Sequence, residues 1–306
     1  MPRRRIDGVL LLDKPPGITS HAALSRVKRL FGAAKAGHTG TLDPLASGLL
    51  PICFGSATRF AHFLLDADKR YTATIRFGVS TTTLDAEGDV VATRPVTFAR
   101  SDLEATLARF TGAIRQVPPA HSALKFEGRP HYEYARRGID VPRPPRDVIV
   151  HALTLVAWGS PDAIVDVHCS KGTYVRTLAA DMGDALGSGA HLAALRRTLT
   201  GPFAIDDAVT IQDLERMDDE ARIASLEPLD APLAAIPKLV VNARTASALR
   251  QGRRPVTPAI DGRYRLYGPK GECVGVGDVA GDRLIAVRLL PWDTTSLHCD
   301  DHGDAP

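Results

Sequence analysis

Residues 69–77 alternate between apolar and polar side chains, and this pattern constrains the fold more tightly than any other segment of the chain. Successive residues of a strand point to opposite faces of a sheet, so the alternation predicts a strand with one apolar face. A sheet of this kind needs other elements to cover its apolar side. The apolar positions are Tyr71, Ala73, Ile75 and Phe77, and the polar positions are Arg70, Thr72, Thr74 and Arg76.

Other segments carry periodicities that predict the elements around this strand. Ser20 is placed to cap a helix that Gly32 ends, and residues 101–104 form a capping box that opens a second helix. A helix with apolar residues at i, i+4 spacing follows a Ser-Lys-Gly junction. The further expected elements are strands at 8–12, 148–157 and 164–169, and helices at 57–65, 174–186, 191–198 and 210–222.

The chain has 306 residues, a length typical of about two domains. Pro228, Pro232 and Pro237 punctuate the expected boundary, beyond which short strands alternate with Gly turns. Residues 115–147 are rich in Pro and Arg and are expected to form a surface insertion. No segment approaches the ~18 to 20 apolar residues of a membrane span, and no secretory signal is visible, so we expect a cytoplasmic protein. The four cysteines lie far apart, which favours neither a disulfide framework nor a zinc ribbon.

The formal net charge is only +3, but the charges are unevenly distributed along the chain. Residues 1–40 hold eight basic and two acidic residues, and residues 206–230 hold nine acidic and two basic residues. Residues 238–293 hold ten basic and five acidic residues. Two basic blocks that flank an acidic one suit an extended polyanion such as RNA or DNA. The same layout also fits an ordinary solvated surface, so charge alone leaves both interpretations open.

Motifs for most cofactor-dependent chemistries are absent from the sequence. It contains no G-x-x-x-x-G-K-[ST] loop and no G-x-S-x-G elbow, and residues 275–281 miss the dinucleotide-binding spacing by one residue. The one H-x-x-x-H pair, His298 and His302, lies within the last nine residues, and the zinc signature of the base deaminases is missing. What remains is the chemistry of carboxylate, aromatic and basic side chains, without a metal or a cofactor.

Asp43 is the main candidate for such chemistry. It lies in an uncharged stretch, residues 39–58, and an apolar run follows it, so its loop is expected to be held against the core. The alternative is that Asp43 caps a short helix, because Asp followed by Pro is a common pair at the start of a helix. The residues alone leave both interpretations open.

Three other residues each have a functional and a structural interpretation. Arg176 lies at a strand-to-helix junction, where backbone N–H groups and a cation often meet an anion, but it could equally pair with Asp181 or with solvent. Tyr71 opens the alternating strand and fits a core aromatic. His38 stands near glycines and fits a turn residue. None of these patterns identifies a site by itself.

Six blocks of sequence, taken together, are more specific. They are residues 12–20 (LDKPPGITS), 37–48 (GHTGTLDPLASG), 69–71 (KRY), 122–125 (SALK), 169–178 (CSKGTYVRTL) and 191–198 (HLAALRRT). In this order they closely resemble the TruB family of tRNA pseudouridine synthases, which convert uridine 55 in the T-loop to pseudouridine. The resemblance spans residues 8–200 and is weaker beyond residue 237, where the chain looks like the small C-terminal PUA domain of that family.

The resemblance implies an α+β fold, with a pseudouridine synthase catalytic domain built on a mixed or antiparallel central sheet with flanking helices. It implies a catalytic domain at 1–235 with a thumb-like insertion at about 115–147, a β-rich, PUA-like RNA-binding domain at 236–293, and a disordered tail at 294–306. The implied activity is isomerisation of uridine 55 after the base is flipped out of the T-arm of tRNA. No metal, cofactor, membrane or obligate protein partner is implied, and we expect a monomer.

The resemblance also assigns roles to single residues. Asp43 matches the catalytic carboxylate, acting as a nucleophile or as a base. The supporting residues are Arg176, which keeps Asp43 ionised, Tyr71, which lies against the uracil, and Lys14, which buttresses the site. The residues that bind RNA or the base are His38, Tyr174 and Leu195. The chain departs from the family at His121, where a Tyr usually precedes the Ser-Ala-x-Lys block, and this leaves the contacts of the insertion open.

Two other functions remain compatible with the residues. A carboxylate-based nucleoside N-glycosidase would use the same kind of Asp but would release the base. A non-catalytic RNA-binding protein or tRNA-folding chaperone would need the basic blocks and not Asp43. An N-glycosidase would lower the mass of the RNA product, because it releases the base. An RNA-binding protein or chaperone would keep its activity when Asp43 is lost.

Overall fold

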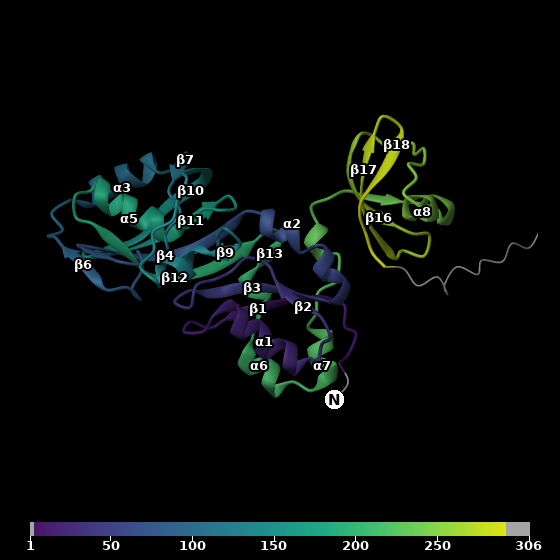
Figure 1. Cartoon of the computed structure of the whole chain (residues 1–306), viewed down its shortest axis with the longest axis horizontal. Coiled ribbons are helices and arrows are strands. Elements are labelled where there is room, and N and C mark those ends of the chain that lie inside the picture. Colours follow the sequence, from purple (N-terminus) through teal and green to yellow (C-terminus); the bar gives the residue numbers. More distant parts are fainter. Residues whose placement is uncertain (1–2, 292–306) are drawn as a thin grey trace, which may run out of the picture.

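The computed structural model describes residues 3–291, so the tail expected at 294–306 lies outside the described residues. Its body is built on a ten-stranded mixed sheet in the order β14-β1-β3-β12-β4-β11-β10-β7, with β13 paired to β12 and β2 to β3 (Figure 1). Most neighbours are antiparallel, and β1–β14 and β12–β3 are parallel. The strands are β1 (Gly8–Lys14), β2 (Ala36–His38), β3 (Ser47–Phe54), β4 (Lys69–Phe77), β7 (Gly112–Gln116), β10 (Arg146–Gly159), β11 (Asp162–Cys169), β12 (Ala190–Thr200), β13 (Phe203–Ala204) and β14 (Val209–Thr210).

Strand β4 has the bounds and the faces that its alternation predicts. Ala73, Ile75 and Phe77 are buried, whereas Arg70 and Arg76 are exposed. Helices α3 (Arg100–Arg109) and α5 (Val175–Ala185) lie over the apolar face, and their buried side chains join those of β4, β11 and β12 in one core cluster. Burial of apolar side chains at roughly 25 cal/mol per Å² is the main stabilisation of such a layer.

A second core lies at the other end of the sheet, where α1 (Ser20–Leu30) and α6 (Ile211–Arg216) pack on β1 and β3. In Figure 1 these helices, with α7 (Asp219–Ala224), lie below the strands. On the opposite face, η1 (Gly55–Arg59) and α2 (Ala61–Asp66) cover a third cluster. The predicted α+β class, with a mixed sheet and flanking helices, is therefore confirmed.

The prediction of a helix at residues 191–198 is wrong, because this segment is the central part of β12. The strand pairs with β4 along its length and with β3 at Arg196 and Arg197. A short apolar run fits a helix and a buried strand equally well by periodicity. The free edges of β3 and β4 decide the outcome, because backbone groups in a buried segment must find partners.

Two predicted helix caps lie one or two residues away from the real ones. Thr19 caps α1 by accepting a hydrogen bond from the N–H of Ala22, so Ser20 is already helical. Helix α3 begins at Arg100 and not at Ser101, and the Asp102 carboxylate accepts from the N–H of Ala99 at 2.8 Å. The acidic helix expected at 210–222 is interrupted and forms α6 and α7.

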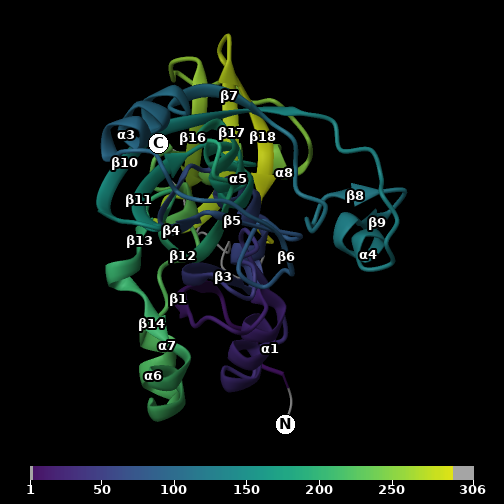
Figure 2. The same ribbon diagram turned by 90° about the vertical axis from the view of Figure 1, so that its left-hand side faces the viewer.

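Residues 117–145 leave the sheet between β7 and β10 and project from the body (Figure 2). They contain the short strands β8 (Lys125–Phe126) and β9 (Arg129–Pro130) and the helix α4 (His131–Ala135). Strands β5 (Val79–Thr81) and β6 (Val90–Thr93) form a separate hairpin. None of the helices within residues 3–291 is long and apolar enough to cross a membrane.

The C-terminal part forms a separate four-stranded sheet beyond one end of the body (Figure 1). Its elements are β15 (Lys238–Val240), α8 (Ala243–Arg250), β16 (Gly262–Tyr267), β17 (Cys273–Ala280) and β18 (Arg283–Leu289). The sheet has its own core and touches the body through an apolar cluster of Phe60, Leu233 and Val276, next to the short helix η3 (Ala231–Leu233). Helix α8, capped by Asn242, was not predicted.

Candidate active site

Asp43 lies on a loop between β2 and β3 that is fixed along its length. At its start, the N–H of Thr39 donates to the carbonyl of Pro51 at 3.0 Å. In its middle, the Ser20 hydroxyl accepts from the N–H of Leu42 at 2.8 Å and donates to the carbonyl of the same residue at 2.9 Å. No helix follows Asp43, because the N–H of Ala46 closes only a turn onto the Asp43 carbonyl. The helix-cap alternative for Asp43 is therefore wrong, and its loop is held against the core.

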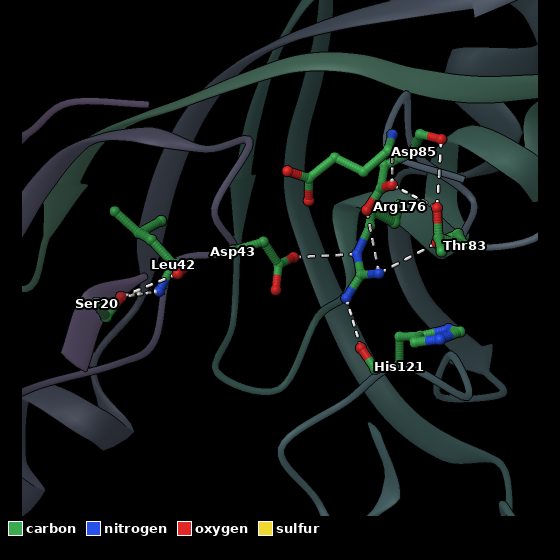
Figure 3. Close-up of polar contacts among 8 residues, drawn as sticks. Ser20, Leu42, Asp43, Thr83, Asp85, His121 and Arg176 are labelled. Atoms are coloured by element: carbon green, nitrogen blue, oxygen red, sulfur yellow. Dashed lines mark hydrogen bonds and ion pairs between the residues drawn. The ribbon is translucent and has the colours of Figure 1, made fainter. Parts of the chain in front are cut away.

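The carboxylate of Asp43 pairs with Arg176, which lies in the first turn of α5. Arg176 Nε is 3.1 Å from Asp43 Oδ2, and the two side chains are 6% and 39% exposed respectively. Figure 3 shows the guanidinium between Asp43 on one side and Asp85 on the other. The partners of Arg176 are thus Asp43 and Asp85, and not the alternative Asp181.

The remaining donors of Arg176 fix the guanidinium in place. Its Nη1 donates to Asp85 Oδ2 at 3.2 Å and to the Thr83 carbonyl at 3.1 Å, and its Nη2 donates to the His121 carbonyl at 2.8 Å (Figure 3). Asp85 is 2% exposed and also accepts from the hydroxyl of Thr83. A buried guanidinium with partners on all three nitrogens is preorganised, so little reorganisation is needed when a substrate arrives.

Asp85 is a site residue that was not expected from the sequence. It follows a Thr-Thr-Thr-Leu run and precedes Ala-Glu-Gly, which is a composition typical of an exposed polar turn. Its neighbour Asp89 in the same turn is exposed, and no periodicity separates the two acids. Only the pairing with Arg176, 91 positions away in the sequence, distinguishes Asp85.

Burial raises the pKa of the Asp43 carboxyl above its ordinary value, because desolvation disfavours the charged form. The positive charges of Arg176 and Lys14 oppose this rise, and the negative charge of Asp85 adds to it. Lys14 is itself fully buried, and its Nζ donates to the carbonyls of Pro15 and Ile18. Desolvation lowers the pKa of Lys14 to about 8, with the charge of Asp43 acting in the opposite direction.

Two cavities meet at Asp43 and Arg176. The smaller has a volume of about 270 Å³, and its walls include Tyr71, Tyr174 and Leu195. The larger, of about 710 Å³, is bordered by His38 and by residues of the insertion, including His121. The structure therefore brings five of the predicted residues together around the smaller cavity and places His38 on the larger one. Lys14 lines neither of them and lies beneath the site.

The aromatic residues of the smaller cavity come from different elements. Tyr71 stands on β4 and is half-buried, packing against both core clusters while one side faces the cavity, so it is a core aromatic and a cavity wall at once. Tyr174 is the residue before α5, and its N–H donates to Gln116 Oε1 at 3.1 Å. Desolvation raises the pKa of both phenols, so both are neutral near pH 7.

His38 ends β2 beside the larger cavity. Desolvation lowers the pKa of its imidazole, and the charges of Arg197 and His21 lower it further. The ring is therefore neutral at pH 7 and can stack on a base or accept a hydrogen bond. Within residues 3–291, no three His, Cys, Asp or Glu side chains converge in a cluster that could hold a metal ion.

Comparisons with known proteins identify the family of this chain. Residues 28–175 match the model of the TruB family pseudouridylate synthase (N terminal domain), and residues 176–234 match that of the tRNA pseudouridylate synthase B C-terminal domain. Proteins named tRNA pseudouridine synthase B from Thiobacillus denitrificans and Chromobacterium violaceum are both 52% identical, each over 94% of this chain and over 97% and 96% of their own length.

Solved structures agree with this assignment at lower identity. A chain in the crystal structure of a Cbf5-Nop10-Gar1 complex superposes with a TM-score of 0.71 at 27% identity, covering 93% of this chain and 85% of that one. A chain in the archaeal box H/ACA sRNP Nop10-Cbf5 complex gives 0.69 at 26% identity, covering 93% and 86%. The sequence identity to the curated relatives, with near-complete coverage on both sides, shows that this chain belongs to the TruB family of pseudouridylate synthases.

Proposed function

We propose that this enzyme isomerises uridine 55 in the T-loop of tRNA to pseudouridine. The observation that carries the proposal is the pairing of a cavity-facing carboxylate, Asp43, with a buried guanidinium, Arg176, whose three nitrogens all have partners. Membership of the TruB family supports the reaction, and the names of the curated relatives support tRNA as the substrate. Because tRNA is the proposed substrate, we expect the protein in the cytoplasm.

The reaction breaks the bond from N1 of the base to C1′ of the sugar and forms a bond from C5 to C1′. The C5 proton is lost and N1 takes up a proton, so no electrons and no transferred group enter. Positive charge develops on the sugar as the first bond breaks, and a carboxylate stabilises it. Asp43 can do so by attacking C1′ as a nucleophile, or it can remove a proton from the neighbouring sugar carbon as a base.

Either route needs Asp43 in its ionised form, in a cavity that the substrate closes to water. Desolvation works against ionisation, and Arg176 works for it because its charge is fixed at 3.1 Å from the carboxylate. Asp85 holds the far side of the same guanidinium. We assign Arg176 the role of keeping Asp43 charged and Asp85 the role of holding Arg176.

We assign the smaller cavity to the flipped-out uracil. Tyr71 and Tyr174 offer aromatic surfaces for the base, and Leu195 offers an apolar one. Since burial keeps the Tyr71 phenol neutral, its resting role is to stack on the base, and it can take the C5 proton only with help from a neighbouring positive charge. His38 borders the larger cavity, where it can support the RNA from which the base has been flipped.

We assign RNA binding to two further parts of the chain. Residues 115–147 correspond to a thumb that covers the T-arm, and residues 236–293 correspond to a PUA-like domain joined to a catalytic domain at 1–235. Phosphate and 2′-hydroxyl contacts would dominate there, because an RNA helix is recognised mainly by its backbone and shape. We expect the protein to act as a monomer.

The experiment that tests the proposal is incubation of the protein with an unmodified tRNA transcript, followed by carbodiimide mapping of pseudouridine by position. We expect a single pseudouridine, at position 55, and an RNA of unchanged mass, because isomerisation adds and removes no atoms. An RNA lighter by one uracil would instead identify an N-glycosidase. Binding without any modification would identify an RNA-binding protein and contradict the proposal.

Replacing Asp85 by Asn should lower the single-turnover rate by about 10- to 100-fold, because the Arg176 guanidinium loses a charge-assisted hydrogen bond that holds it. The affinity for tRNA should stay within about twofold, since Asp85 is buried. The matched control is Asp89→Asn, which removes an exposed carboxylate from the same turn. Equal rates for the two variants would contradict the assigned role of Asp85.

Reversing the charge of Arg253 or Arg254, both exposed after α8, should weaken tRNA binding about 10-fold and leave the rate at saturating enzyme unchanged. The slope of log Kd against log salt should also fall by roughly 0.7 to 0.9 for each phosphate that the variant no longer neutralises. Arg216→Glu, on the exposed face of α6, is the control. A reduced rate with normal affinity would place the role of these residues in chemistry instead.

A further inference from the structure

Arg197 is a buried cation that the roles assigned above do not use. It lies on β12 and is only 1% exposed, which makes it one of the largest fully buried side chains of the protein. Arginine is almost never fully buried unless its charge is matched, and Arg176 follows this rule with two carboxylates. The position of Arg197 therefore calls for a separate explanation.

The hydrogen bonds of Arg197 go to main-chain carbonyls. Its Nε donates to the carbonyl of Leu49 on β3 at 2.7 Å, and its Nη2 donates to the carbonyl of Gly40 at 3.0 Å. Gly40 belongs to the loop that carries Asp43. The guanidinium thus links the central sheet directly to the catalytic loop, at a point between the contacts of Thr39 and Leu42 already described.

The strand register brings Arg197 against a second site residue. Arg197 on β12 stands directly opposite Tyr71 on β4, and both line the smaller cavity together with Asp43. On the other side, Arg197 pairs with Gly48 of β3, where a Cβ atom would lie 2.3 Å from the Arg197 carbonyl oxygen. The backbones of β12 and β3 thus approach closely at Arg197, which a glycine at residue 48 permits.

The positive charge of Arg197 affects the pKa of several neighbouring groups. It lowers the pKa of the buried Lys14 and Lys69, after the larger effect of desolvation. The same positive charge also opposes the desolvation that raises the pKa of the Tyr71 phenol. Arg197 is thus the neighbouring positive charge that makes the phenol easier to ionise.

We propose that Arg197 is a positioning residue of this active site, which holds the Asp43 loop and the Tyr71 phenol at a fixed separation across the smaller cavity. The inference deepens the proposed function and rests on it for its kinetic consequence. A carboxylate that acts on the sugar and a phenol that lies against the base of the same nucleotide need such a common support, because a misplacement of about 1 Å can cost 100-fold in rate. A merely structural arginine would stabilise the fold without coupling the two residues.

The first test uses Arg197→Lys, which keeps the charge but loses the planar fork that bonds the Leu49 and Gly40 carbonyls from two different nitrogens. We expect a single-turnover rate on tRNA about 10- to 100-fold lower, with Kd within about twofold. The matched control is Arg196→Lys, the preceding residue, which is half-exposed and pairs with Asp13. In a Tyr71→Phe background the same substitution should cost less, because one of the groups that Arg197 holds is already gone. Equal losses in both backgrounds would overturn the proposal.

A second variant leaves Arg197 in place and moves its guanidinium. A Cβ atom at Gly40 would lie 3.3 Å from Arg197 Nη1, so Gly40→Ala should lower the rate at least about 10-fold without changing Kd. Gly187→Ala is the control for backbone strain, because its φ of +75° is close to the +84° of Gly40 and its Cβ would meet nothing within 4 Å. Gly40→Ala with the wild-type rate would overturn the proposal even if the Arg197 variants failed to fold.

A titration without RNA separates this proposal from the proposed function. A fluorinated tyrosine placed at position 71, whose phenol is more acidic than that of tyrosine, allows its ionisation to be followed by fluorine NMR in the full chain. Arg197→Met should raise the pKa of this phenol by about 1 unit or more, because a nearby positive charge is lost. An unchanged titration would overturn the coupling of Arg197 to Tyr71, whether or not the protein modifies tRNA.

Discussion

Replacing Asp43 by Asn is expected to lower pseudouridine formation by at least about 10³-fold while tRNA affinity stays within about twofold. Asn has nearly the same shape as Asp but carries no charge, so it can neither attack the sugar nor remove a proton. The fold should survive, because Arg176 keeps its bonds to Asp85, Thr83 and the insertion. The measurements are single-turnover product formation at saturating enzyme and filter binding of the same tRNA.

A matched control for this variant is Asp166→Asn on β11. Asp166 also pairs with an arginine, Arg70, at 2.7 Å, but on the polar face of the sheet away from the cavities. Exposed pairs of this kind contribute little to stability, so the control should be fully active. Product formed by Asp43→Asn at the normal rate would rule out Asp43 as the catalytic carboxylate.

Replacing Arg176 by Met should move the acidic limb of the pH–rate profile to higher pH. Desolvation already raises the pKa of Asp43, and Arg176 is the main group that lowers it, so removing the guanidinium raises that pKa further. The reaction needs the ionised carboxylate, and a higher pKa means that a higher pH is required to reach it. Near pH 6 the loss of rate should therefore be larger than near pH 8.

The same variant should also unfold more easily. Removing Arg176 leaves Asp85 buried without its cation, and breaking such a pair costs about 3–5 kcal/mol. Arg176→Lys is the informative comparison, because it keeps the charge and loses the planar fork. We expect its acidic limb to stay in place and its plateau to fall about 100-fold. An acidic limb that does not move in Arg176→Met would contradict the electrostatic role, and denaturant unfolding of both variants reports the stability separately.

The parts of the fold that could be predicted from the sequence are those whose signal is local. The strand at residues 69–77 was predicted with its bounds and its buried face, because alternation is a property of the segment itself. The segment 191–198 was predicted wrongly, because its apolar spacing fits a helix as well as the strand that β3 and β4 impose on it. Short segments are decided by their neighbours, which a single sequence does not reveal.

In the candidate site too, residues with a local sequence signal were predicted, and contacts between distant residues were not. Asp43 and Arg176 were singled out by their local settings, an uncharged loop and a strand-to-helix junction, but their mutual pairing came only from the family resemblance. Ser20 was assigned to a helix cap, which is the role of its neighbour Thr19, because its real partner Leu42 lies 22 positions away. Asp85 was not noticed, and Arg197 was noticed only as part of the block 191–198 without a role, since each is defined by contacts with residues distant in the sequence.

The contact between Arg176 and the insertion bears on position 121, where the sequence is expected to depart from the family. Arg176 Nη2 bonds the main-chain carbonyl of residue 121, and the imidazole of His121 takes no part in that bond. Every amino acid supplies the same carbonyl oxygen, so an exchange of the side chain there leaves the anchor of the guanidinium intact. Evolution can thus change the chemistry that this position presents to the RNA without loosening the arginine behind it.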